Sequence, residues 1–181
     1  ALLFMNRLAP ILPAGNVLVN VEATSKKRAF EHAGLLFENQ HAIARAVVTD
    51  NLFARERLGS TGLGHGVAIP HGRSGGITRL CGLFARFEKP IDFEALDGQP
   101  VDIAFVLLAP EGAGADHLKA LARVARALRS PMVLNRLRSA FEAQAGLRVV
   151  AHGRIDLFEP QGALQLYVDS LQPAGVGDLA L

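Results

Sequence analysis

The hydrophobic and polar residues alternate with helical spacing near the start of the chain. From Ser25 to Phe37, the apolar residues Phe30, Ala33 and Phe37 recur three and four positions apart, with charged side chains between them. Serine is a common first residue of a helix, because its side-chain oxygen accepts a hydrogen bond from the first turn. The pattern predicts an amphipathic helix over these residues.

A second helix is predicted from about His41 to Leu58, where Gly59 is well placed to end it. Its apolar side is expected to consist of Ile43, Val47 and Ala54. Arg55 then lies on the last turn of this helix, close to the glycine-rich stretch that follows.

Three short apolar runs bounded by Gly, Pro and Asp are typical of strands buried in a sheet: Val67–Ile69, Leu80–Phe87 and Val101–Leu108. The last of these is the most apolar and is predicted to be central. Helical spacing returns from Asp116, with an apolar stripe formed by Leu118, Leu121, Ala125 and Leu128, and a further helix is predicted over 131–141. Helices that alternate with strands indicate a layered α/β domain.

Composition narrows the class of protein. A chain of 181 residues with 50% hydrophobic and 20% charged residues can form one domain with a sizeable core. The net charge of +2 and the 6% aromatic content do not favour nucleic-acid binding, which uses clustered basic and aromatic side chains.

The single cysteine, Cys81, excludes an intrachain disulfide and any paired-cysteine metal motif, and it fits a reducing compartment such as the cytoplasm. The apolar start of the chain is interrupted by Arg7 and two prolines, so it is a poor signal peptide. No apolar run approaches the roughly 18 residues of a membrane-spanning helix. We expect no membrane insertion.

The stretch GSTGLGHGVAIPHGR, from Gly59 to Arg73, contains two histidines, His65 and His71. Its glycine spacing matches neither nucleotide-binding fingerprint, and Ser60 does not lie in a GxSxG elbow. Metal binding by His65, His71 and His117 lacks a supporting spacing.

Histidine as a nucleophile remains, since neutral imidazole can attack a phosphoryl group. Such a site needs an arginine fork and further donors for the phosphoryl oxygens. These can come from Arg55, Ser60, Thr61, the glycine amides and His117.

Three segments carry a resemblance to a known family: RERLGSTGLGHGVAIPHGR, PIDFEALDGQPVDIAFVLLAP and DHLKALARVARALRS. From about Met5 to Val150 the chain resembles the enzyme IIA domain of the fructose and mannitol class of the bacterial phosphotransferase system, and most of all its stand-alone nitrogen-regulatory type. The resemblance implies a single-domain α/β/α sandwich with a mixed sheet and helices on both faces. We therefore expect this domain over 1–155, followed by a C-terminal tail over 156–181 that is mobile or folds back as a short element.

The resemblance also implies roles for individual residues. His71 is expected to be the phosphoacceptor, with Arg55 and His117 beside the phosphoryl group. Ser60, Thr61 and Gly72 are expected to bind phosphate. The family uses no metal and no organic cofactor.

The implied partners are a histidine-phosphorylated carrier protein and regulatory protein targets linked to nitrogen or potassium. The alternative is the IIA component of a fructose- or mannitol-type transport system, which passes its phosphate to a IIB protein. His65 is expected to be a solvated side chain without a catalytic role. A basic stripe on the helix after Asp116 is either a solvated face or a docking surface for an acidic partner: Lys119, Arg123, Arg126 and Arg129.

Overall fold

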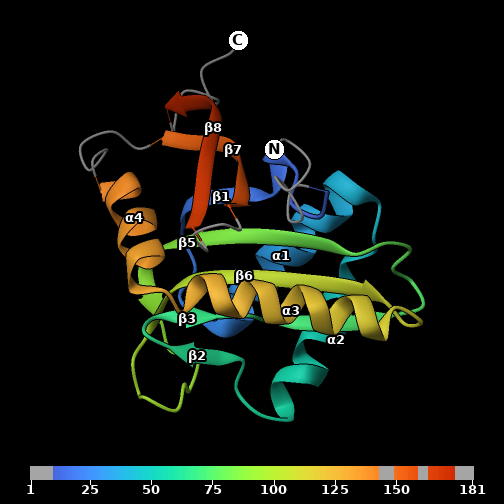
Figure 1. Cartoon of the computed structure of the whole chain (residues 1–181). Helices are drawn as coiled ribbons and strands as arrows, with labels where there is room; N and C mark the ends of the chain where they lie inside the picture. Colours follow the sequence, from blue (N-terminus) through green and yellow to red (C-terminus); the bar gives the residue numbers. More distant parts are fainter. Residues whose placement is uncertain (1–9, 143–148, 159–162, 174–181) are drawn as a thin grey trace.

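The computed structural model describes residues 10–142, 149–158 and 163–173 (Figure 1). A short 3-10 turn at Ala14–Asn16 precedes the first strand. The strands are β1 (Val17–Val21), β2 (Gly62–Gly64), β3 (Val67–Ala68), β4 (His71–Ser74), β5 (Cys81–Ile91), β6 (Val101–Pro110), β7 (Val149–Phe158) and β8 (Ala163–Pro173). The helices are α1 (Lys26–His41), α2 (Arg45–Arg57), α3 (Gly114–Leu128) and α4 (Pro131–Glu142).

Strand β6 is the centre of a six-stranded mixed sheet of order β1-β5-β6-β3-β2, in which β4 also pairs with β6. β5 runs antiparallel to β6, whereas β3 and β4 run parallel to it. The prediction that Val101–Leu108 forms a central strand is confirmed. Most of its side chains are buried, on both faces of the sheet, which explains why the run is apolar except for Asp102.

Helices cover both faces of this sheet, as Figure 1 shows with α3 and α4 in front and α1 and α2 behind. One core cluster joins α3 and α4 to sheet residues such as Phe105 and Leu107. A second cluster joins α1 and α2 to the opposite face, around Leu83 and Val106. The mixed α/β/α architecture is therefore confirmed.

The first predicted helix is confirmed, and its start is capped as expected, since the Ser25 hydroxyl accepts a hydrogen bond from the Arg28 N–H at 3.2 Å. The predicted start of the second helix at His41 is wrong. His41 is the last residue of α1, Ala42 takes a left-handed conformation with φ of 54°, and α2 begins only at Arg45.

The buried side of α2 also differs from the prediction. Val48 and Leu52 are its buried residues, whereas Ala54 is exposed. Helix α3 is likewise rotated relative to its predicted stripe, because Leu118 is 68% exposed. The side chains that α3 buries are His117, Ala120, Val124, Ala127 and Leu128.

A proline interrupts the strand that leads to His71. β3 and β4 both run along the same side of β6, and Pro70, which has no N–H, separates them. The Pro70 carbonyl still accepts a hydrogen bond from the Leu107 N–H at 2.9 Å. His71 therefore begins a new strand at a fixed register, opposite Leu107.

β7 and β8 form a separate two-stranded antiparallel sheet that lies next to β1 (Figure 1). The predicted boundary between residues 155 and 156 falls inside β7. Of the predicted C-terminal tail, residues 159–162 and 174–181 lie outside the described residues, as do residues 1–9 at the start of the chain.

Candidate functional site

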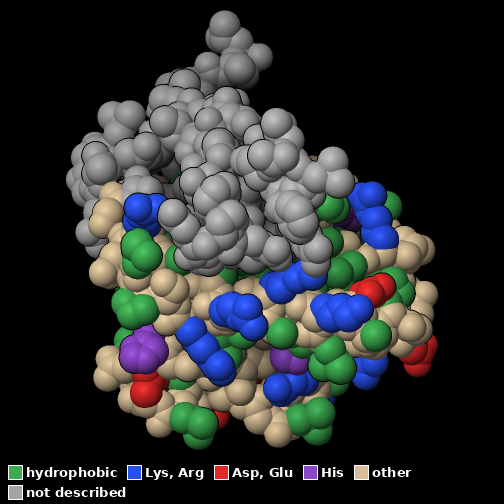
Figure 2. Space-filling view, in the orientation of Figure 1, with side chains coloured by type: hydrophobic (Ala, Val, Ile, Leu, Met, Phe, Trp, Pro, Cys, Tyr) green, Lys and Arg blue, Asp and Glu red, His purple; other side chains and the backbone are tan. Residues whose placement is uncertain are grey.

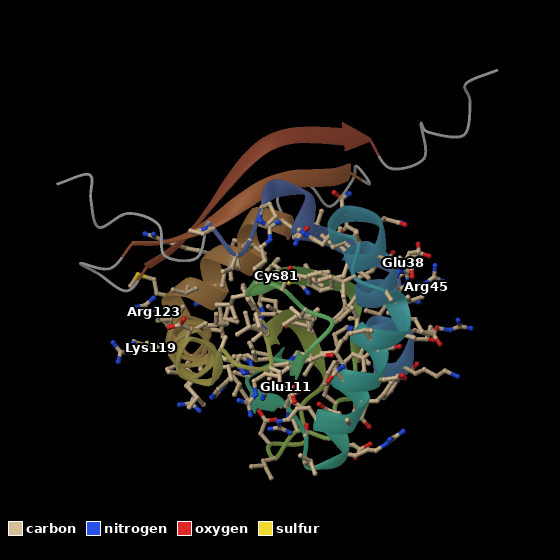
Figure 3. The ribbon with its side chains drawn as sticks, turned by 90° about the vertical axis from the view of Figure 1, so that its right-hand side faces the viewer. Glu38, Arg45, Cys81, Glu111, Lys119 and Arg123 are labelled. Atoms are coloured by element: carbon tan, nitrogen blue, oxygen red, sulfur yellow. The ribbon has the colours of Figure 1, made fainter. Side chains whose placement is uncertain are left out.

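A cavity of about 590 Å³ opens between the end of α2, strand β4 and the start of α3. α2 contributes Asn51, Ala54 and Arg55, followed by Leu58, and β4 contributes His71, Gly72 and Arg73. The remaining wall consists of Glu111, Gly114, His117, Leu118 and Leu121. Figure 3 shows Glu111 between α2 and α3, with α3 seen almost end-on. The cavity thus brings together three residues predicted for the site, Arg55, His71 and His117.

The two nitrogens of His71 have different partners. Nδ1 lies 2.7 Å from the Ile69 carbonyl oxygen, and because a carbonyl only accepts, this nitrogen carries the proton. Nε2 accepts a hydrogen bond from Arg55 Nε at 3.0 Å. The contacts therefore assign the tautomer whose free lone pair is on Nε2.

Close packing of α2 against β4 places Arg55 beside this ring. A Cβ on Gly72 would come within 3.0 Å of the Asn51 Cβ, so only glycine allows the helix to lie this close. Arg55 follows Asn51 by one helical turn and so lies over the start of β4. Its Nη1 also donates to the Gly59 carbonyl at 2.8 Å, which fixes the guanidinium at the helix end.

His117 lies in the first turn of α3 and is only 5% exposed. Its ring is 5.6 Å from that of His71, centroid to centroid, in an edge-on arrangement. Burial, followed by the nearby His71 and then Arg73, lowers the pKa of His117 from 6.5 to about 4. The ring is therefore neutral at neutral pH.

Burial also lowers the pKa of His71, and the Arg55 charge acts in the same direction. The hydrogen bond to the Ile69 carbonyl, which favours the protonated ring, and the Glu56 carboxylate oppose these two effects. The net result keeps the Nε2 lone pair available at neutral pH.

The two hydroxyls predicted to bind phosphate have other partners. Thr61 Oγ1 donates to Glu56 Oε2 at 2.6 Å, and the Thr61 N–H points at the same carboxylate. Ser60 Oγ donates to the Phe93 carbonyl and accepts from the Gly62 N–H. Neither residue lines the cavity. In this structure both hydroxyls hold the loop, whereas Gly72 lies in the cavity wall.

Glu56, the neighbour of Arg55, ties this loop to the body of the protein. Its side chain is 6% exposed and forms an ion pair with Lys26 of α1 at 3.1 Å. A partly buried carboxylate that is paired and hydrogen-bonded in this way holds its surroundings firmly, since removing either partner leaves a buried charge unpaired. Glu56 therefore fixes the end of α2, from which Arg55 extends.

Two glycines of the stretch, Gly64 and Gly66, serve the β2–β3 turn, outside the cavity. Gly64 and Gly66 have φ values of 88° and 79°, and a Cβ on Gly66 would lie 2.7 Å from Arg138 Nη2. His65, with φ of 55°, donates its N–H to Asp97 at 2.8 Å and is exposed. Its position agrees with a solvated side chain.

Arg73 is a charged residue in the cavity wall that the sequence pattern did not assign to the phosphate site. It follows Gly72 along β4 and is exposed at the cavity mouth. Strand alternation gives the only signal, since Arg73 lies two residues after His71 and so on the same side of β4.

Two further features are absent from residues 10–142, 149–158 and 163–173. No cluster of three or more His, Cys, Asp or Glu side chains there could hold a metal ion. No helix in this part of the chain has both the length and the apolar character needed to cross a bilayer.

The chain and its fold have relatives among known proteins. Residues 10–152 match the family described as "Phosphoenolpyruvate-dependent sugar phosphotransferase system, EIIA 2", and the chain belongs to this family. Its similarity to phosphotransferase IIA proteins supports a phosphocarrier role within that system.

Within the family, several relatives of high similarity have a regulatory name. The "Nitrogen regulatory protein" of Bradyrhizobium diazoefficiens is 49% identical over 140 residues, which cover 75% of this chain and 88% of that protein. The protein of the same name from Pseudomonas aeruginosa is 45% identical over 147 residues, which cover 81% of this chain and 96% of that protein. The crystal structure of nitrogen regulatory protein IIA-Ntr from Neisseria meningitidis is 45% identical, with a TM-score of 0.70 over 73% of this chain and 90% of that one.

Proposed function

We propose that His71 accepts a phosphoryl group on Nε2 from a histidine-phosphorylated carrier protein of the phosphotransferase system. The supporting observation is the assignment of the two ring nitrogens. Nδ1–H is held by the Ile69 carbonyl at 2.7 Å, which leaves Nε2 as the nitrogen with a free lone pair. His71 thus has the orientation that a nucleophile requires.

In the transfer step, the Nε2 lone pair attacks phosphorus and forms the new P–N bond. The P–N bond of the carrier's phosphohistidine breaks, and its electron pair returns to the carrier's imidazole. The proton on His71 Nδ1 stays in place, and the Ile69 carbonyl stabilises the positive charge that the ring gains. No metal ion or organic cofactor enters this scheme.

Arg55 has two roles in this mechanism. Before transfer its Nε–H occupies the Nε2 lone pair at 3.0 Å, so the incoming phosphoryl oxygens must draw this donor away. After transfer the same guanidinium is placed to hold those oxygens through charge-assisted hydrogen bonds. His117 places a second imidazole beside the ring of His71. Because His117 is neutral, it does not repel the positive charge that the His71 ring gains on transfer.

The output we propose is regulatory. Relatives that are 45–49% identical are named nitrogen regulatory proteins, and a phosphoryl group adds nearly two negative charges at the cavity mouth. Reversible binding of protein targets linked to nitrogen or potassium would then depend on the phosphorylation state of His71. Transfer to a sugar-specific IIB protein is the alternative.

The direct test is phosphorylation by the purified upstream carrier, followed by mapping of the modified residue. We expect one acid-labile, alkali-stable phosphate on His71, because a P–N bond hydrolyses once its ring is protonated. His71→Ala should lose all labelling and keep the wild-type circular dichroism spectrum. An acid-stable phosphate, or labelling that survives His71→Ala, would refute the proposal.

A further inference from the structure

The start of α3 forms the wall of the cavity that faces His71, and it lacks a side-chain cap. Ala113 occupies the N-cap position and provides no side-chain acceptor. The first helical hydrogen bond runs from the His117 N–H to the Ala113 carbonyl at 2.9 Å, so the N–H groups of residues 114–116 precede it. An uncapped helix start with free donors attracts an anion.

A buried side chain at the same place lacks a partner as well. His117 Nε2 has no hydrogen-bond partner among the described residues, although the side chain is 5% exposed. A buried polar atom without a partner is costly in a folded protein and commonly marks a place where a ligand or water binds. His117 and Gly114 both line the cavity, so the buried ring and the helix start border the same space.

Arg73 adds a positive charge to that wall. Its Nη1 lies only 3.0 Å from where a Cβ on Gly114 would stand, so the guanidinium rests against the first residue of α3. Within the described part of the chain, Arg73 forms no ion pair or side-chain hydrogen bond. Glu111 is the acidic residue of the cavity, and it is exposed at the rim.

These features lie across the cavity from Arg55, which is already engaged with His71 and with the Gly59 carbonyl. We propose that Arg73, the first-turn N–H groups of α3 and His117 Nε2 form a second binding site for phosphoryl oxygens, and that Arg73 is a catalytic residue of the transfer. This inference rests on the proposed function. Arg55 then holds the phosphoryl group from the α2 side, while Arg73 and α3 hold it from the other.

A carrier protein must approach the same surface, so Arg73 could act by contacting the carrier and not the phosphoryl group. The two roles predict different results. Docking affects only reactions that involve the carrier. An Arg73 that touches phosphoryl oxygens also acts when no carrier is present. The test therefore uses phosphoramidate, a small phosphoryl donor, together with the isolated phosphorylated protein.

Arg73→Ala should slow labelling of His71 by phosphoramidate about ten- to a hundredfold, the usual effect of losing one charge-assisted donor in a preorganised site. The second ionisation of the phosphoryl group, followed by phosphorus NMR, should move to higher pH, because the cation that favours the dianion is gone. Arg57→Ala is the matched control: Arg57 is exposed on the same turn of α2 as Arg55 and lies outside the cavity wall, so both values should stay close to wild type.

Inorganic phosphate provides a test that does not need a phosphorylated protein. Added to the unphosphorylated chain, it should shift the amide resonances of Ala115 and Asp116, and Arg73→Ala should weaken this binding at least about fivefold. Wild-type rates and phosphoryl ionisation in Arg73→Ala, with His71 still labelled, would overturn the second site and leave the proposed function intact. Absence of labelling on wild-type His71 would overturn the proposed function, and the phosphate titration would then decide the second site alone.

Discussion

The two imidazoles of the cavity are both held neutral, and in His117 this has a consequence for stability. Its pKa is about 4 in the folded protein against 6.5 ordinarily, so below pH 6.5 the unfolded chain takes up the proton first. The contribution of His117 to stability is therefore fully present above pH 6.5 and is lost as the pH falls to about 4.

Urea unfolding at pH 7 and pH 4.5 measures this loss. His117→Gln should lose less stability between the two pH values than wild type, since glutamine does not titrate. His65→Gln, which replaces an exposed histidine, should keep the wild-type pH dependence. Equal pH dependence in wild type and His117→Gln would show that His117 is not held neutral by the fold.

Arg55 makes two hydrogen bonds in different directions, to His71 Nε2 and to the Gly59 carbonyl. A lysine ammonium is a single point donor and does not reproduce this fork. Arg55→Ala should slow single-turnover transfer about a hundredfold. Arg55→Lys should restore only part of the wild-type transfer rate. Rapid-quench measurements give these rates, and a wild-type rate in either variant would remove Arg55 from the mechanism.

Among the elements, two connections between strands contain glycines with positive φ: Gly66 in the β2–β3 turn, at 79°, and Gly98 between β5 and β6, at 66°. A Cβ on Gly66 would lie 2.7 Å from Arg138 Nη2 and 2.8 Å from Asp102, whereas a Cβ on Gly98 would meet nothing within 4 Å. Only Gly66 is required for both its backbone conformation and the close approach of α4.

Gly98→Ala should therefore cost about 1 kcal/mol, the strain of a left-handed alanine. Gly66→Ala should cost about 1–3 kcal/mol more, because it also pushes apart the packed Arg138–Asp102 ion pair. Urea unfolding of the two variants gives both values. Similar costs would mean that the contact with Arg138 adds nothing to the backbone requirement.

Most elements could be predicted from the sequence because their patterns report burial. The central strand and α4 are such cases. The face of α3 was predicted one position out of register, because a polar residue, His117, occupies the inward side while Leu118 points outward. Hydrophobic spacing carries no information on a buried histidine.

The candidate site was only partly predictable for a related reason. His71, Arg55 and His117 carry the family pattern and meet in one cavity. Ser60 and Thr61 lie beside them in sequence, but their hydroxyls turn toward Phe93 and Glu56. Arg73 became a candidate only when the fold placed it against Gly114.

For the molecule as a whole, charge at the cavity mouth and charge along α3 lie on one surface. Figure 2 shows Lys and Arg side chains gathered over α3, where Lys119, Arg126 and Arg129 are exposed. The phosphoryl group proposed for His71 would add negative charge near this basic face and so change which partners the face attracts. A regulatory protein should bind different partners in its two states.

Pull-downs with unphosphorylated wild type and with His71→Glu, which places a permanent negative charge at the acceptor position, should recover different partner sets. We expect no sugar permease among the main partners. His65→Glu, which adds the same charge outside the cavity, should recover the wild-type set. Identical sets for wild type and His71→Glu, or efficient onward transfer to a sugar-specific IIB protein, would favour the transport alternative.

The central claim is that the fold presents Nε2 of His71 as the phosphoacceptor by holding Nδ1–H at the Ile69 carbonyl. Long-range proton–nitrogen NMR of the histidine rings tests it directly, with the protein measured before and after phosphorylation by the carrier. We expect the Nδ1–H tautomer of His71 before transfer and phosphorus coupling to Nε2 afterwards. Phosphorus attached to Nδ1, or to any other side chain, would contradict the account.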